Sequence, residues 1–245
     1  MLDDFYYTLP VPTLLAISLL LAAFLFGSIP CGFLIARARG IDIRTHGSGN
    51  IGATNVWRVC GRGPGLLCFF LDFLKGLVPS LLAGALINNL ISTRLATLSE
   101  TTSAALWLAV ALAAVLGHMF TPWLGFKGGK GISTGFGALL GVYPVFTLAA
   151  LVALLAWLLA LAITRMVGIS SVLAAAALTI VVVGSHFASP ALNTSLSRIP
   201  IYQPATTVHA AFAAALLLLI IFKHRANIAR TFKGTEPKVG RKKST

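Results

Sequence analysis

Acidic side chains are scarce in this sequence. The 245 residues include six Asp or Glu and 19 Lys or Arg. Six dispersed carboxylates are too few for paired acid–base catalysis or for the oxygen ligands that a divalent cation requires. We therefore expect no magnesium or zinc site and no cofactor.

Cysteine is also rare, and several familiar motifs are missing. Cys31, Cys60 and Cys68 are an odd number without a C-x-x-C spacing, which favours small buried thiols over disulfides or a zinc site. The five histidines show no metal-ligand spacing, and none is followed by the H-x-x-x-x-D pattern of acyltransferases that use a His–Asp pair as base. Asp3 and Asp4 replace the basic segment of a cleaved signal peptide, so the first apolar run is expected to remain as a span.

Apolar residues dominate what is present. They make up 57% of the chain, charged residues make up 10%, and the mean hydropathy is +0.90. This composition is typical of a polytopic membrane protein and leaves no room for a separate soluble domain. We predict one all-α membrane domain over residues 1–245, with 237–245 as a basic cytoplasmic tail. The basic residues are scattered among short loops, which argues against nucleic-acid binding.

Long apolar runs predict the membrane spans, because about 20 helical residues cross the hydrocarbon layer. Residues 132–163 are too long for one simple crossing, and Gly141 to Pro144 offer a break. If this stretch crosses twice, Arg165 and the basic tail share a side with the arginine-rich loop 37–63, as the positive-inside tendency requires. Arg94, Arg198, Asp3, Asp4 and Glu100 then lie outside. We predict seven transmembrane helices, one of them short, with the N-terminus outside and the C-terminus cytoplasmic, at 11–36, 64–91, 103–121, 132–142, 144–163, 168–187 and 205–222.

The first polar loop contains the glycine-rich run GSGNIGATN, residues 47–55. Glycines in such a run let backbone N–H groups approach a bound anion, while hydroxyls, amides and arginines add hydrogen bonds. A phosphate site is one interpretation, and a polar turn between two helices is the other. The candidate residues are Gly47, Ser48, Gly49, Asn50, Gly52, Thr54 and Asn55, with Arg44 and Arg58 flanking them.

A second glycine-rich run, GFKGGKG, follows the third predicted span. It is not a Walker A loop, because Leu124 and Gly131 stand where that motif requires glycine and Ser or Thr. Lys127 and Lys130 beside Gly128 and Gly129 still favour phosphate binding over a merely topological basic loop.

Polar groups also interrupt the predicted spans. Asp72 and Lys75 lie three residues apart on one helix face, so they can form an ion pair that is either structural or functional. Residues 27–30 contain Pro30, which indicates either a simple kink or backbone that faces a site. Near the C-terminus, His224 and Asn227 share a face if the last helix continues past residue 222, although a helix end with snorkelling cations fits as well.

These clusters lack a strong general base. They suit a substrate that arrives already activated with a good leaving group, so that positioning and charge stabilisation suffice for catalysis. A transporter for anions is the rival class, since broken helices and cationic loops also occur in carriers. Against it, the charged groups gather at one membrane face, and no corresponding halves are visible. A purely structural scaffold leaves the glycine-rich loops unexplained.

Five separated runs resemble the bacterial acyl-phosphate:glycerol-3-phosphate acyltransferases: GSGNIGATNVWR, DFLKGLVP, GHMFTPWLGFKGGKG, RMVGISS and KHRANIARTFKGTE. The likeness covers roughly residues 24–236. It implies transfer of a fatty acyl group from acyl phosphate to the sn-1 hydroxyl of glycerol 3-phosphate, giving lysophosphatidic acid and inorganic phosphate. It also implies a multi-pass protein of the bacterial cytoplasmic membrane with its active site on the cytoplasmic side, and interaction with the enzyme that produces acyl phosphate.

The resemblance suggests roles for individual residues. Ser48, Asn50, Thr54 and neighbouring amides would hold the phosphate of acyl phosphate and the developing oxyanion. Arg44, Arg58, Lys127 and Lys130 would neutralise the phosphates, His224 and Asn227 match an essential C-terminal pair, and Ser171 matches the second serine of a turn. The proton acceptor stays open between His224 and the phosphate of glycerol 3-phosphate. Gly168 stands where the family has the first serine, so either Ser170 substitutes or that contact is dispensable.

Overall fold

The computed structural model describes residues 11–92, 98–188, 194 and 206–239, and all regular structure in this part of the chain is helical. Asp3, Asp4, Arg94, Arg198 and the end of the basic tail, residues 240–245, lie outside the described residues. The long helices are α1 (Val11–Ser28), α4 (Arg62–Ser92), α5 (Glu100–Met119), α7 (Thr147–Thr164), α8 (Val167–Phe187) and α10 (Thr207–Phe232). The shorter ones are α2 (Cys31–Arg37), η1 (Ile43–Thr45), α3 (Ala53–Cys60), η2 (Pro122–Leu124) and α6 (Ile132–Gly141).

Six helical stretches are long and apolar enough to cross a membrane, and α6 is a shorter apolar helix. The predicted break in 132–163 is confirmed, because α6 ends at Gly141 and α7 begins at Thr147. The last helix runs on to Phe232, ten residues beyond the predicted span, as the shared face of His224 and Asn227 requires. Which terminus faces the cytoplasm stays a prediction.

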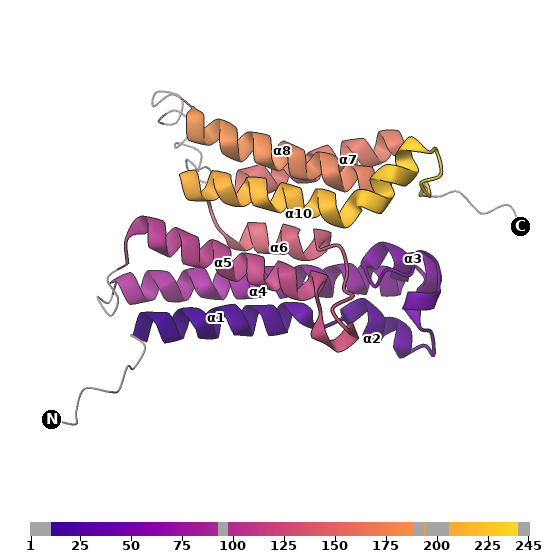
Figure 1. Cartoon of the computed structure of the whole chain (residues 1–245), viewed down its shortest axis with the longest axis horizontal. Helices are drawn as coiled ribbons and strands as arrows, with labels where there is room; N and C mark the ends of the chain where they lie inside the picture. Colours follow the sequence, from indigo (N-terminus) through magenta and orange to yellow (C-terminus); the bar gives the residue numbers. More distant parts are fainter. Residues whose placement is uncertain (1–10, 93–97, 189–193, 195–205, 240–245) are drawn as a thin grey trace, which may run out of the picture.

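The helices form two groups, which are visible in Figure 1. In the first, α1 packs against α5, and α4 packs against α5 and α6. In the second, α8 packs against both α7 and α10. The groups touch each other mainly where α10 meets α5 and where α6 meets α7. A space between the two groups is therefore the place to look for a ligand.

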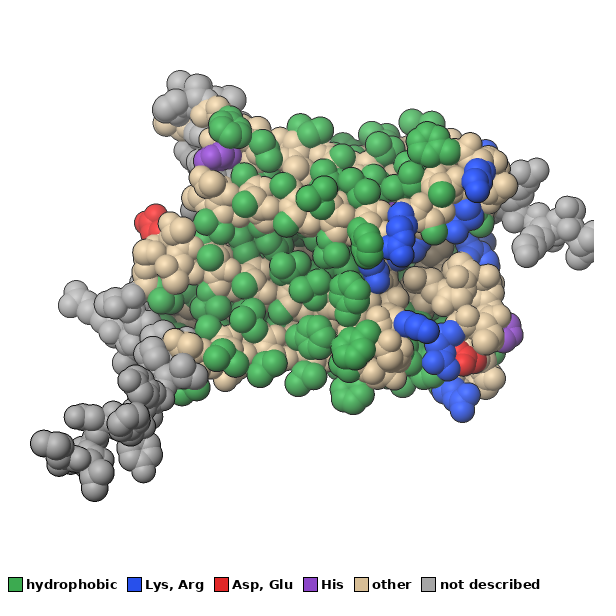
Figure 2. Space-filling model, viewed as in Figure 1, with side chains coloured by type: hydrophobic (Ala, Val, Ile, Leu, Met, Phe, Trp, Pro, Cys, Tyr) green, Lys and Arg blue, Asp and Glu red, His purple; other side chains and the backbone are tan. Residues whose placement is uncertain are grey.

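The polar loops gather at one end of the bundle. In Figure 1, α2 and α3, the loop before α6, the turn between α7 and α8, and the end of α10 all lie at this end. Figure 2 shows Lys and Arg side chains concentrated towards the same end. The elements that carry the glycine-rich loops and the His224–Asn227 pair thus share one side, as the sequence predicts.

The chain breaks between α1 and α2 at Ile29 and Pro30, and the freed backbone is used. The Ile29 carbonyl accepts a hydrogen bond from Lys75 Nζ at 2.7 Å, and the Ser28 carbonyl accepts one from Thr121 Oγ1 at 2.6 Å. In a continuous helix, N–H groups of the next turn would bond to these carbonyls. Here the carbonyls instead tie α4 and the loop after α5 to the end of α1. The freed carbonyls thus bind side chains of the protein itself, and that this backbone faces a ligand site stays a prediction.

Helix α3 lies inside the stretch that the sequence predicts as a polar loop. It has only eight residues and is bounded by Gly52 and Gly61, so its apolar pattern is too short to stand out. Its buried face carries Asn55 and Val56. This short helix holds the C-terminal half of the first glycine-rich run in place.

Candidate functional site

A cavity of about 730 Å³ is lined by residues of both helix groups and of the loops at the polar end. Its polar lining includes the first glycine-rich loop together with Arg58, Lys130, Ser171, His224 and Asn227. Its apolar lining comes from α6, α7, α8 and α10. Most of the residues proposed from the sequence therefore meet in one place, although they come from four separate segments.

Asn55 organises the first glycine-rich loop from within. Its side-chain oxygen accepts the Ser48 N–H at 2.9 Å, and its amide nitrogen donates to the His46 and Asn50 carbonyls at 3.0 and 2.9 Å. The Asn50 side chain accepts the Gly52 N–H at 2.8 Å. The N–H groups of Ser48 and Gly52 are therefore already engaged within the loop.

Three side chains of this loop region are placed to bind an anion. Ser48, Thr54 and Arg58 are exposed, and all three line the cavity. The Arg58 guanidinium also lies 3.4 Å from Asn55 Oδ1, which keeps the cation near the loop. Gly47, Gly49 and Gly52 line the cavity as well, and their missing side chains make room for the loop's own atoms, since a Cβ at Gly47 would overlap Asn55 Oδ1.

Arg44 lies away from the cavity. Its guanidinium forms an ion pair with Asp42 at 2.7 Å and lies over the Phe33 ring, 5.0 Å from the centroid. Hydrogen bonds from the Arg44 side chain and backbone hold the pKa of Asp42 at about 2. The structure therefore engages Arg44 elsewhere, and its contact with phosphate stays a prediction.

The second glycine-rich loop places only one of its two lysines in the cavity. Lys130 lines it and donates a hydrogen bond to Asn227 Oδ1, whereas Lys127 is exposed and outside it. The N–H groups of Gly128 and Gly129 donate to the Met119 and His118 carbonyls at 3.2 and 3.0 Å. A Cβ on either glycine would overlap His118. Close packing on α5 is therefore what these two glycines provide.

Burial changes the titration of Lys130. Loss of solvation lowers its pKa to about 8, Glu236 raises it in part, and the charges of Arg230 and Lys223 lower it further. The ammonium is thus held among other cations in a partly dry site. A bound phosphate dianion would relieve this repulsion, which is the electrostatic signature of an anion site.

His224 and Asn227 lie on one face of α10, and both are buried. His224 Nδ1 is 2.9 Å from the Ile220 carbonyl. A carbonyl oxygen can only accept, so in a neutral ring Nδ1 carries the proton and Nε2 is left as an acceptor. The prediction that both side chains point at one object is consistent with their shared place in the cavity wall.

Glu236 is a site residue that sequence reasoning missed. Its Oε1 accepts from Asn227 Nδ2 at 2.6 Å and its Oε2 from Arg230 Nε at 2.8 Å, and the side chain is buried. The available signal was its position, nine residues after Asn227 at the end of the last family-like run. Glu236 fixes the amide so that Asn227 Oδ1 points at Lys130.

Ser171, which the sequence places in a turn, lies in the first part of α8. Its hydroxyl lines the cavity, donates to the Val167 carbonyl at 2.8 Å and accepts from Trp157 Nε1 at 3.2 Å. Ser170 is buried, lies off the cavity lining and donates to the Met166 carbonyl at 2.8 Å. A Cβ at Gly168 would overlap the Asn227 side chain. The absence of a side chain at Gly168 is therefore coupled to the placement of Asn227.

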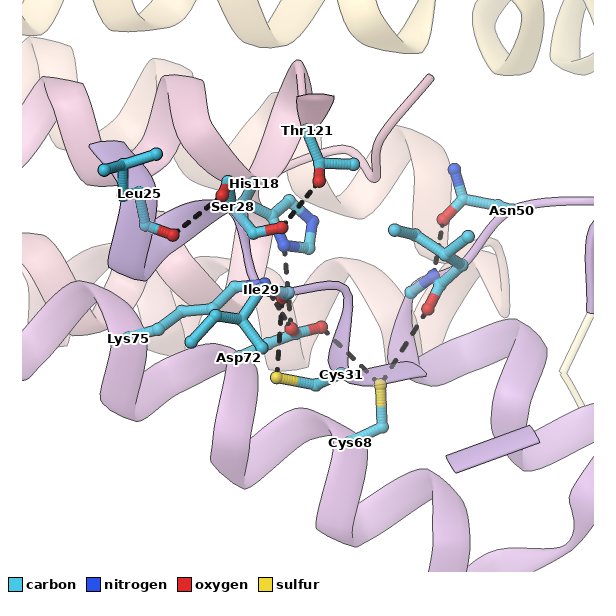
Figure 3. A network of polar contacts seen from close by, with 12 residues as sticks. Leu25, Ser28, Ile29, Cys31, Asn50, Cys68, Asp72, Lys75, His118 and Thr121 are labelled. Carbon is cyan, nitrogen blue, oxygen red and sulfur yellow. Dashed lines mark hydrogen bonds and ion pairs between the residues drawn. The ribbon is translucent and has the colours of Figure 1, made fainter. Parts of the chain in front are cut away.

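A buried polar network supports this site from α4 and α5 (Figure 3). Lys75 Nζ lies 2.8 Å from Asp72 Oδ1, His118 Nδ1 lies 3.6 Å from the same oxygen, and both carboxylate and ammonium are 3% exposed. The predicted Asp72–Lys75 pair is confirmed, and His118 joins it. Asp72 and His118 also line the cavity. Because His118 packs on Gly129, the network supports the loop that carries Lys130.

The site can bind anions and stabilise developing negative charge, since its cations and hydroxyls converge at the mouth of an apolar space. Among the described residues, no group of three or more His, Cys, Asp or Glu side chains could hold a metal ion.

Comparison with known proteins gives a consistent answer. The family model for glycerol-3-phosphate acyltransferase matches residues 17–234. A glycerol-3-phosphate acyltransferase of Geobacter sulfurreducens is 42% identical over 215 residues, covering 87% of this chain and 92% of that protein. One of Desulforamulus reducens is 40% identical over 229 residues, covering 93% and 97%.

The solved structure of PlsY, an integral membrane glycerol 3-phosphate acyltransferase in its glycerol 3-phosphate form, is similar too, with a TM-score of 0.72 and 34% identity. The match covers 92% of this chain and 96% of that one. A second structure of PlsY, in its lysophosphatidic acid form, has a TM-score of 0.70. The helical bundle, the converging polar loops and these matches agree, and the chain belongs to the glycerol-3-phosphate acyltransferase family.

Proposed function

We propose that this protein transfers a fatty acyl group from acyl phosphate to the sn-1 hydroxyl of glycerol 3-phosphate. The hydroxyl oxygen attacks the acyl carbonyl carbon, a new ester C–O bond forms, and the C–O bond to the phosphate group breaks. The products are lysophosphatidic acid and inorganic phosphate. Because acyl phosphate is a mixed anhydride, its leaving group departs with little acid assistance.

The observation that carries this proposal is the two-part cavity. Its mouth gathers Lys130, Arg58 and the hydroxyls of the glycine-rich loop, and its interior is walled by apolar residues of four helices. A phosphate and a fatty chain on one molecule match these two parts. Related PlsY structures are described as glycerol 3-phosphate and lysophosphatidic acid forms, which supports the acceptor and the product.

The residues at the mouth have complementary roles in this reaction. Lys130 and Arg58 neutralise phosphate oxygens, and Ser48 and Thr54 donate hydrogen bonds to phosphate or to the oxyanion that forms during attack. Asn227 holds the Lys130 ammonium in position. Preorganised charge and positioning then suffice for catalysis in this proposal, because acyl phosphate is already activated by its phosphate leaving group.

Two groups are candidates to accept the hydroxyl proton. His224 presents Nε2 as an acceptor because Nδ1 faces the Ile220 carbonyl. The phosphate of glycerol 3-phosphate is the other candidate, since its second pKa lies near neutrality. A pH–rate profile of His224→Gln separates them: loss of the acidic limb assigns the proton to His224, and an unchanged limb assigns it to the substrate.

The direct test uses purified protein in detergent with acyl phosphate and glycerol 3-phosphate, and measures both phosphate release and lysophosphatidic acid. We expect the two products in equal amounts. Turnover with acyl-CoA or acyl carrier protein but none with acyl phosphate would contradict the proposed donor. Turnover without a sealed vesicle would also exclude obligatory transport, whereas uptake into proteoliposomes without turnover would favour the carrier hypothesis.

A further inference from the structure

The apolar part of the cavity extends deep into the bundle and ends in a blind end formed by Ala150, Leu178 and Ala213. These residues line the cavity from α7, α8 and α10. Ala150 and Ala213 are 0% exposed and Leu178 is 3% exposed, so this part is closed to the surface. The lining therefore changes from polar residues at the mouth to three buried apolar side chains at the inner end.

Further buried side chains lie one helical turn beyond each of these residues. Phe146 precedes Ala150 by four residues on α7, His209 precedes Ala213 by four on α10, and Val182 follows Leu178 by four on α8. The Phe146 ring contacts the His209 ring at 5.8 Å and the Phe212 ring at 5.6 Å between centroids. These contacts seal the cavity across the gap between α7 and α10.

The depth of this space fits one lipid chain. From Ser171 to Leu178 along α8, and from His224 to Ala213 along α10, helix rise gives about 10 and about 16 Å. Half of a bilayer's hydrocarbon layer, the thickness that one lipid chain fills, is about 15 Å. A chain whose carbonyl lies at the mouth would thus reach the blind end.

We propose that the blind end measures the acyl chain of the donor, so that Ala150, Leu178 and Ala213 determine which chain lengths are used. This inference rests on the proposed function, because it takes the apolar space as the acyl site. The two alanines and Leu178 are close-packed and form the floor that the end of the chain meets, and the aromatic contacts behind them keep this floor from yielding to a longer chain. A larger side chain at either alanine shortens the available space without touching the phosphate-binding mouth.

The test compares Ala213→Leu with Ala214→Leu, its neighbour on α10, which is exposed on the outer surface and does not line the cavity. The kcat/KM is measured for lauroyl, myristoyl, palmitoyl and stearoyl phosphate. We expect Ala213→Leu to lower the ratio of stearoyl to lauroyl kcat/KM by about tenfold or more, as removal of methylene-sized space does in other pockets. The KM for glycerol 3-phosphate stays unchanged, and Ala214→Leu keeps the original profile.

A uniform loss for all chain lengths, or an unchanged profile, would overturn the measuring role while leaving the proposed reaction intact. Ala150→Leu repeats the test from α7 should Ala213→Leu fail to fold. If the unaltered protein turns over none of the acyl phosphates, the proposed reaction itself fails. In that case the role of the blind end is tested by binding. Thermal shifts are measured with lysophosphatidic acids of the same chain lengths. If Ala213→Leu keeps the long-chain stabilisation of the unaltered protein, the inference is wrong.

Discussion

The two helix groups are packed by different means. In the first group, glycines bring helix backbones into direct contact: a Cβ at Gly76 would overlap the Thr134 carbonyl, and one at Gly137 would overlap the Phe73 carbonyl. Gly27 and Gly117 make the same kind of contact between α1 and α5. Within a membrane, where burial of apolar surface drives helix association weakly, such close approach is a main source of packing energy.

The second group lines the apolar side of the cavity with small side chains of α7 and α8, among them Ala153 and Ala175. Its close glycine contact at Gly168 is with a side chain, because a Cβ there would overlap Asn227. Gly184 of α8 is exposed and faces open space. The first group is thus joined backbone to backbone and frames the two glycine-rich loops, whereas the second group supplies small side chains to the cavity wall.

The largest expected effect comes from filling a backbone contact of the frame. Gly76→Leu should prevent recovery of folded protein, because the side chain would meet the Thr134 backbone and overpacking at rigid sites costs about 3 kcal/mol or more. Gly184→Leu, at an exposed position of the second group, is the control, and its melting temperature in detergent should stay close to that of the original. Equal tolerance at both positions would contradict the rigid backbone contact at Gly76.

The next effect concerns buried charge. Asp72→Asn leaves the 3%-exposed Lys75 without its carboxylate and should destabilise the fold by about 3–5 kcal/mol. Asp42→Asn breaks the solvent-exposed pair with Arg44 and should hardly move the melting temperature. Thermal unfolding of both variants measures the difference. Adding Lys75→Met to Asp72→Asn should recover most of the loss, and failure to do so would point to His118 as the essential partner.

The hydrogen bond from Lys130 to Asn227 joins the two helix groups at the polar end, and it should matter for activity more than for folding. Lys130→Ala should lower kcat/KM by about 100-fold, since it removes a cation from the cavity and from Asn227. Lys127→Ala should cost less than about fivefold, because that side chain is exposed and off the cavity. Equal losses would restore the role that the sequence assigns to Lys127.

The smallest effect is a pH dependence. Because burial lowers the pKa of Lys130 to about 8, its positive charge is lost as pH rises through that value in the free enzyme. We expect kcat/KM to decline above pH 8, and kcat to decline less because bound phosphate restores the charge. Lys130→Arg stays charged, so its kcat/KM should lack this decline. An identical alkaline limb in that variant would assign the titration to another group.

Sequence reasoning predicted the membrane class, the seven apolar helical segments and many of the polar residues that line the cavity. It succeeded because apolar runs, basic loops and glycine-rich motifs are local patterns. It treated Lys127 and Lys130 alike, because both stand beside glycines, whereas only Lys130 lines the cavity. Their different positions follow from how Gly128 and Gly129 pack on α5.

The missed features are all long-range. Glu236 is buried through partners on α10, and Asn55 acts inside its loop through hydrogen bonds up to twelve residues away. His118 joins Asp72 and Lys75 across two helices. None of these residues stands in a pattern that distinguishes it from an ordinary surface carboxylate, loop amide or helical histidine.

The sequence by itself determined that the chain enters the membrane as a series of helices with polar loops gathered at alternate connections, because hydropathy and the cost of exposed backbone in lipid leave no other arrangement. Only the tertiary structure decided which cations reach the substrate space and how far that space extends into the bundle. Both depend on contacts between helices distant in sequence: Gly129 against His118 positions Lys130, and Phe146 against His209 closes the apolar end.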